Sequence, residues 1–91
     1  MFHVVSYDIS DDRKRTAVSK TLLDYGSRVQ YSTFECILDD EAMLEEMIGR
    51  LSRIVSDEDS VRIYVMCAKC EKIITILGHG EVSKDEKVFI I

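Results

Sequence analysis

The sequence has no hydrophobic run near the roughly 20 apolar residues needed to cross a bilayer. Its first nine residues also lack the basic stretch and long apolar segment of a secretory signal peptide. Only three cysteines are present, and an odd, sparse set argues against a secreted domain held together by disulfides. We therefore expect a cytoplasmic protein with reduced thiols and no membrane partner.

A net positive charge is also missing, since the formal net charge at pH 7 is -5. This excludes a uniformly basic surface for nucleic acid. The acidity is concentrated in residues 36–60, which hold eight acidic and two basic residues, whereas residues 1–35 hold five of each. The basic residues of the first part are Arg13, Lys14, Arg15, Lys20 and Arg28. A polyanion would therefore meet this part of the chain.

Common catalytic motifs are absent as well. Gly78 and Gly80 do not open an apparent helix, so there is no glycine-rich phosphate loop. His3 and His79 are isolated, and neither has a spacing that pairs it with a nucleophile. Hydrolysis by this chain would have to rely on a water molecule activated by a metal ion.

Cys67 and Cys70 form a CxxC pair, for which Cys36 and His79 are the only further zinc ligands. A structural zinc site needs four ligands, commonly as two close pairs, and only one pair is present. The strand-to-helix setting of a thioredoxin motif is also lacking. We therefore expect reduced cysteines in a turn and no zinc site, with zinc as the alternative.

The 91 residues form a single domain that buries only about 60–65% of its unfolded surface, so a second copy would add stability. Residue patterning predicts a strand at Phe2–Asp8, a helix over residues 11–25 stopped by Gly26, and an extended segment over residues 28–38. A second helix follows, with its N-terminus at residues 39–41 and its apolar stripe at residues 44–54. The rest of the chain contains a strand at residues 61–66, a short β-branched run at residues 73–77 and an apolar tail at residues 87–91. Both faces of the segment 28–38 are partly apolar, which indicates burial on both sides or a bend.

This order predicts an α+β fold, the ferredoxin-like βαββαβ arrangement with a four-stranded antiparallel sheet, two helices on one face and an extra C-terminal strand. The opposite face of the sheet has no helix to cover it, so a second sheet is the expected cover. We expect the domain to span residues 1–78. Residues 79–91 would then be a linker and a strand that pairs with another protomer or with a partner protein.

Asp8 is the strongest candidate for chemistry, because a strand end just before a helix can hold a carboxylate toward a ligand. A helix-capping role beside Asp11 and Asp12 is equally open. Mg²⁺ commonly takes one or two carboxylates and keeps several waters. The hypothesis is therefore one Mg²⁺ ion shared by two Asp8 side chains across a dimer axis.

Three segments closely resemble a known family: Val5–Arg13 (VSYDISDDR), Tyr25–Glu35 (YGSRVQYSTFE) and Asp59–Tyr64 (DSVRIY). It is the second CRISPR-associated protein family, the small subunit that joins the spacer-acquisition integrase. The resemblance runs from about residue 2 to Gly80, and a CxxC pair also occurs in many such sequences. It implies a homodimer with a catalytic, Mg²⁺-binding Asp8 near the two-fold axis, acting as an endonuclease on RNA or double-stranded DNA and associating with the integrase.

The resemblance also implies roles for basic residues after the first strand and before the second. These correspond to Arg15 and Arg28, with Arg13 in the same basic run and Phe34 at the family's aromatic position. Local alternatives remain open: Arg15 as a solvated helix residue, Arg28 as a turn residue and Phe34 as a core residue.

Two other functions are consistent with the sequence. One is a DNA-binding scaffold of the integrase complex that needs no hydrolysis. The other is a toxin-like ribonuclease, since that class can share this fold and the fold alone does not fix function.

Overall fold

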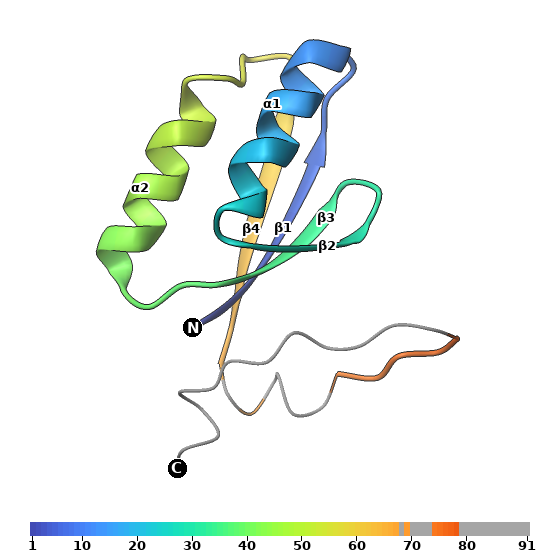
Figure 1. The fold of residues 1–91 in the computed structure, drawn as a ribbon, viewed down its shortest axis with the longest axis vertical. Helices are drawn as coiled ribbons and strands as arrows, with labels where there is room; N and C mark the ends of the chain where they lie inside the picture. The colour runs from blue at the N-terminus through green and yellow to red at the C-terminus, as the bar shows by residue number, and fades with distance from the viewer. Residues whose placement is uncertain (68, 70–73, 79–91) are drawn as a thin grey trace.

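The computed structural model describes residues 1–67, 69 and 74–78 (Figure 1). Its elements follow in the order β1 (Phe2–Asp8), α1 (Asp12–Leu23), β2 (Gly26–Gln30), β3 (Thr33–Ile37), α2 (Glu41–Ser52) and β4 (Ser60–Met66). The expected βαββαβ order is confirmed, and β1 has the predicted bounds.

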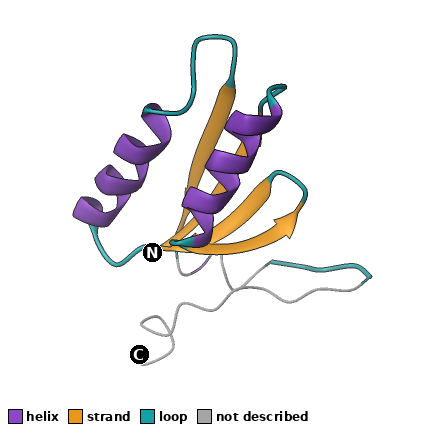
Figure 2. Ribbon diagram, turned by 45° about the horizontal axis from the view of Figure 1, so that its top comes forward, coloured by secondary structure: helices purple, strands orange, loops and turns teal. Residues whose placement is uncertain are grey.

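The four strands form one sheet in the order β2-β3-β1-β4, and every neighbouring pair is antiparallel. Both helices lie on the same side of this sheet (Figure 2). The α+β ferredoxin-like fold class is therefore confirmed. No described helix covers the opposite face, which carries alternate residues such as Val4, Ser6 and Tyr64.

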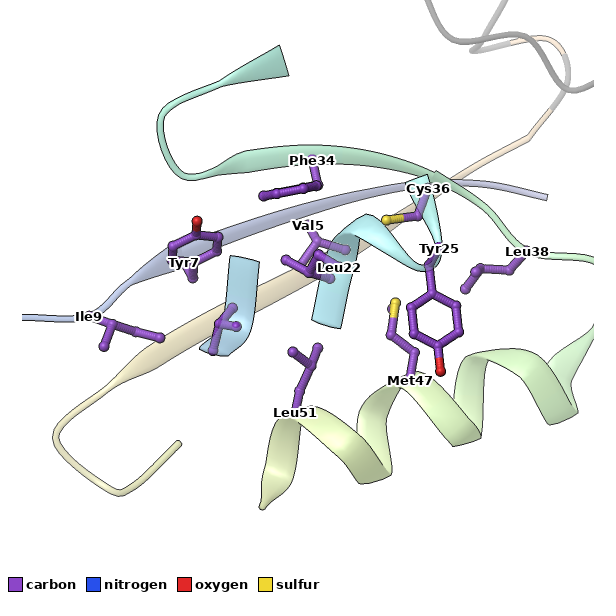
Figure 3. Packing of buried hydrophobic residues seen from close by; sticks show 11 residues of the cluster. Val5, Tyr7, Ile9, Leu22, Tyr25, Phe34, Cys36, Leu38, Met47 and Leu51 are labelled. Carbon is purple, nitrogen blue, oxygen red and sulfur yellow. The ribbon is translucent and has the colours of Figure 1, made fainter. Parts of the chain in front are cut away.

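The core lies between the sheet and the helices (Figure 3). Strand alternation explains its composition, because Val5 of β1 stands opposite Phe34 of β3 and both are fully buried. Helix α1 adds Val18 and Leu22 at helical spacing, and α2 adds Met47 and Leu51. Burial of this apolar layer fixes β1 in the middle of the sheet, with strands on both sides.

The extended segment expected over residues 28–38 is in fact a hairpin of two strands, with a turn at Tyr31 and Ser32. Its mixed apolar pattern arises because the two strands have different burial. Strand β2 is a sheet edge, where Val29 is 41% exposed, whereas β3 lies inside the sheet. The register also shifts between Arg28 and Gln30, which interrupts the alternation that a single strand would show.

The sequence suggested that Gly26 stops α1, but the helix already ends at Leu23, with Asp24 as its C-cap. Gly26 instead begins β2, where the backbone of β3 comes unusually close. A Cβ atom at this position would lie 2.6 Å from the Cα of Cys36 and would also collide with the carbonyl oxygen of Glu35. A glycine is required here because the two backbones leave no room for a side chain.

We expect Gly26→Ala to lower the free energy of unfolding by about 1–3 kcal/mol, because backbone atoms must move to admit the methyl group. Gly49→Ala is the matched control: a Cβ there meets nothing within 4 Å. Since Gly49 lies inside α2, its replacement should raise the free energy of unfolding by about 0.5–1 kcal/mol. Urea denaturation of both variants measures the two changes in the free energy of unfolding. Equal changes would contradict the close approach of the β2 and β3 backbones at Gly26.

The remaining expectations concern the C-terminal part. Residues 74–77 of the expected β-branched run are not in a strand, because no neighbouring strand pairs with them in the described sheet. The predicted linker and strand at residues 79–91 lie outside the described residues. Within the described part of the chain, neither helix has the length and hydropathy to span a membrane.

Candidate nucleic-acid cleft

Asp8 is the last residue of β1, a strand held on both sides by its neighbours, and it stands opposite Ser60 of β4. The residue is exposed. Within the described part of the chain, its carboxylate has no hydrogen-bond or ion-pair partner. The α1 N-cap is Asp11, whose Oδ2 accepts a hydrogen bond from the Lys14 amide at 2.9 Å. The helix cap therefore belongs to Asp11, and the Asp8 carboxylate remains available to a ligand.

A cleft of about 650 Å³ opens beside Asp8, between the end of β1, one face of α1 and the β2–β3 hairpin. Its lining residues are Tyr7, Asp8, Ile9, Arg15, Thr16, Ser19, Lys20, Arg28, Tyr31 and Ser32. The structure thus brings together three of the site residues predicted from the sequence, although they are up to 20 positions apart in the chain. One carboxylate lies among three cationic side chains there.

Arg28 is held in place by two contacts. Its guanidinium carbon lies 5.5 Å from the centroid of the Phe34 ring, and its Nη2 donates a hydrogen bond to Ser19 Oγ. Phe34 is completely buried, and its ring centroid is 6.3 Å from that of Tyr7. Phe34 is therefore a core residue, which was one of the two roles that the sequence left open. It can influence a ligand in the cleft only through Arg28.

Arg15 organises the loop between β1 and α1. Its Nη1 donates to the carbonyl oxygens of Ile9 at 3.0 Å and Ser10 at 3.3 Å. Its Nη2 also forms an ion pair with Asp12. The loop that follows Asp8 is therefore tied to the first turn of α1, and Arg15 adds positive charge to the cleft wall.

Arg13 and Lys14 complete the basic run but do not line the cleft. Lys14 Nζ lies 3.2 Å from Asp59 Oδ2 and 2.7 Å from Ser56 Oγ, in the segment between α2 and β4. Its hydrogen bond to Asp59 raises the pKa of Lys14, while hydrogen bonds from the Ser56 amide and from Lys14 lower the pKa of Asp59. Lys14 thus joins α1 to the α2–β4 segment.

A second, smaller hollow of about 330 Å³ lies on the other side of Asp8. Its lining residues are Ser6, Tyr7, Asp8, Ser60, Arg62 and Tyr64. Five of these belong to the helix-free face, because Ser6 and Asp8 of β1 stand opposite Arg62 and Ser60 of β4, and Tyr64 lies on the same face of β4. Asp8 therefore lies where the cleft meets the uncovered face of the sheet.

Metal ligands are sparse in the described residues, where no three acidic, histidine or cysteine side chains gather around one point. Cys36 is buried in the core, and burial raises the pKa of its thiol to about 11, so it is unsuited to bind zinc. Cys67 is exposed, while Cys70 and His79 lie outside the described residues.

The sequence reasoning missed several polar residues of the cleft as site residues, namely Thr16, Ser19, Lys20, Tyr31 and Ser32. The first three could have been found, since Arg15, Thr16, Ser19 and Lys20 share one helical face at spacings of one, three and one. Tyr31 required the hairpin turn to be located first.

The fold and the cleft define a small ferredoxin-like domain whose first strand carries an available carboxylate into a cation-lined hollow. The family described as CRISPR associated protein Cas2 matches residues 1–74. The chain belongs to this family, as the resemblance of its motifs predicted.

Known relatives agree along most or all of the chain. CRISPR-associated endoribonuclease Cas2 1 of Chloroflexus aurantiacus is 43% identical over 96 residues, covering 100% of both chains. CRISPR-associated endonuclease Cas2 2 of Thermus thermophilus is 37% identical, covering 98% of this chain and 94% of the relative. The crystal structure of Streptococcus pyogenes Cas2 at pH 6.5 has a TM-score of 0.75 at 31% identity, covering 86% of this chain and 100% of that chain.

Proposed function

We propose that this protein acts in CRISPR spacer acquisition as a homodimeric, Mg²⁺-dependent endonuclease on RNA or double-stranded DNA. The observation that carries the proposal is the Asp8 carboxylate, which has no partner among the described residues and lines a cleft with three cationic side chains. The names of the relatives, one an endoribonuclease and the other an endonuclease, support cleavage of phosphodiester bonds.

The cations of the cleft bind and orient the polyanion. Arg28, stacked on Phe34 and bonded to Ser19, presents its guanidinium in a fixed orientation, which suits a phosphate. Lys20 adds an ammonium from α1, and Arg15 keeps the loop after Asp8 in place. The phosphate backbone is thereby positioned beside Asp8 without a uniformly basic surface.

A single Asp8 fits a Mg²⁺ ion only in part, because one carboxylate leaves most of the coordination to water. Two copies would supply two carboxylates. The two Asp8 carboxylates would hold the ion, which would supply an activated water and offset charge on the scissile phosphate. The basic residues of the cleft would hold the phosphate.

Dimerisation through the helix-free face is supported by the place of Asp8 at the border of that face. Tyr64 in the same hollow is half exposed, so a second copy would remove aromatic surface from water. Residues 79–91 would pair with the second copy or with the integrase subunit, the partner that we propose for the dimer.

A binding scaffold without hydrolysis is the second candidate. The observation that favours it is the single carboxylate of the cleft, because no second acid or histidine among the described residues lines the cleft as a general base. In this case Asp8→Ala would leave spacer integration intact.

Metal removal tests the first candidate. We expect chelation with EDTA to abolish cleavage of RNA and DNA oligonucleotides, and added Mg²⁺ to restore it. Titration with Mn²⁺, followed by electron paramagnetic resonance, should reveal one ion per two chains in a protein that sediments as a dimer. Cleavage that persists in EDTA, or one tightly held ion per monomer, would contradict the shared site.

A further inference from the structure

Tyr31 is unusual for an aromatic residue, because it is 96% exposed at the turn of the β2–β3 hairpin. It also lines the cleft that contains Asp8, Lys20 and Arg28. A ring exposed to water gains no stability from the hydrophobic core, so core packing does not explain why an aromatic residue occurs here. A planar ring on the rim of a cationic cleft is suited to a flat ligand.

The position of Tyr31 is fixed even though its ring is exposed. The backbone amide of Tyr7 donates a hydrogen bond to the carbonyl oxygen of Ser32 at 3.0 Å. The Tyr7 hydroxyl donates to the carbonyl oxygen of Tyr31 at 3.5 Å. The backbone of the turn therefore lies against β1 at Tyr7, one residue before Asp8.

Three cationic side chains line the same cleft as this ring, namely Arg15, Lys20 and Arg28. Lys20 extends from α1 into the same cleft, and its ammonium forms no ion pair within the described residues. Arg28 has its guanidinium committed to the Phe34 ring and Ser19. Lys20 is thus the most available cation for a phosphate beside the aromatic ring.

We propose that Tyr31 stacks on an unpaired nucleic-acid base and that Lys20 binds the adjoining phosphate. The site selects a strand with an unpaired base near Asp8, such as a single strand or a frayed end, over an intact duplex. In a duplex each base face is covered by its neighbours, so only an unpaired or terminal base can offer its face to the ring. This inference rests on the proposed binding of nucleic acid in the cleft and names the form of the substrate.

The test measures binding by fluorescence anisotropy in EDTA, so that hydrolysis plays no part. The probes are a short single-stranded oligonucleotide and a duplex whose two ends are closed by hairpins. Tyr31→Ala should weaken single-strand binding about tenfold, the effect of losing one stacked base, and change duplex binding by less than about twofold. Tyr31→Phe should bind like the wild type, because the ring is retained.

Two further measurements separate stacking from general electrostatics. A 2-aminopurine base scanned along the single strand should be quenched at one position by the wild type and by Tyr31→Phe, but not by Tyr31→Ala. Lys20→Ala should lower the salt dependence of binding by about one phosphate contact. Leu23→Ala, an exposed α1 position outside the cleft, is the control and should change nothing.

Equal weakening of single-strand and duplex binding by Tyr31→Ala would overturn the inference, as would an unchanged affinity for the single strand. A wild type that binds the closed duplex more tightly than the single strand would overturn it too. None of these results depends on cleavage. The failure of the nuclease proposal, seen as absent Mg²⁺-dependent cleavage, is therefore distinguishable from the failure of the stacking site.

Discussion

Phe34→Ala should strongly destabilise this domain. Phe34 is fully buried between β1 and the helices, and truncating a buried phenylalanine costs about 3–5 kcal/mol through lost burial and the cavity left behind. Domains of this size are commonly stable by only about 5–15 kcal/mol. Urea denaturation followed by circular dichroism measures the loss, and a decrease below about 1 kcal/mol would contradict the position of Phe34 in the core.

A conservative variant separates the core role of Phe34 from its contact with Arg28. Phe34→Leu retains most of the apolar volume and should cost about 1–2 kcal/mol. It removes the ring beneath the guanidinium, however, so Arg28 loses one of the two contacts that hold it in the cleft. Phe34→Leu should therefore remain folded and bind nucleic acid more weakly than the wild type, whereas Cys36→Ala, at another buried β3 position, should affect stability alone.

Much of the fold followed from local patterns in the sequence. The β1 bounds and the start of α1 near residue 11 were predictable because alternation in a strand and acidic residues at a helix start are signals carried by neighbouring residues. The β2–β3 hairpin was not resolved, because its turn, Tyr31–Ser32, contains no glycine or asparagine to mark it. The role of Gly26 depends on the approach of β3, a contact between segments distant in sequence.

The candidate site was only partly predictable for the same reason. Asp8, Arg15 and Arg28 were named from the motifs, and the structure places all three around one cleft. Lys20 could have been found from the helical face that it shares with Arg15, but the place of Tyr31 beside this face emerges only when the hairpin is packed next to the helix. Nor could the sequence distinguish Asp8 from Asp11 as the helix cap, because both precede α1 and only the backbone geometry selects Asp11.

Asp8→Ala should reduce Mg²⁺-dependent cleavage by about 100-fold or more, the order of effect for losing a group that stabilises transition-state charge. The fold should be unaffected, since Asp8 is exposed and has no hydrogen-bond or ion-pair partner in the described residues. We expect its free energy of unfolding to stay within about 0.5 kcal/mol of the wild type. Loss of cleavage would then report on chemistry and not on unfolding.

Asp57→Ala is the matched control, because Asp57 is also an exposed aspartate but lies in the segment between α2 and β4, outside the cleft. It removes the same charge from the protein at a distance from the site. The control should cleave at the wild-type rate, which excludes an effect of net charge on polyanion binding.

The central claim is that Asp8 is the metal-binding catalytic residue of this chain. Its most direct test is the initial rate of oligonucleotide cleavage by wild type, Asp8→Ala and Asp57→Ala, purified in parallel and assayed with Mg²⁺ and with EDTA. We predict cleavage by wild type and Asp57→Ala that requires Mg²⁺, and almost none by Asp8→Ala. An Asp8→Ala protein that cuts as fast as the wild type would contradict the claim.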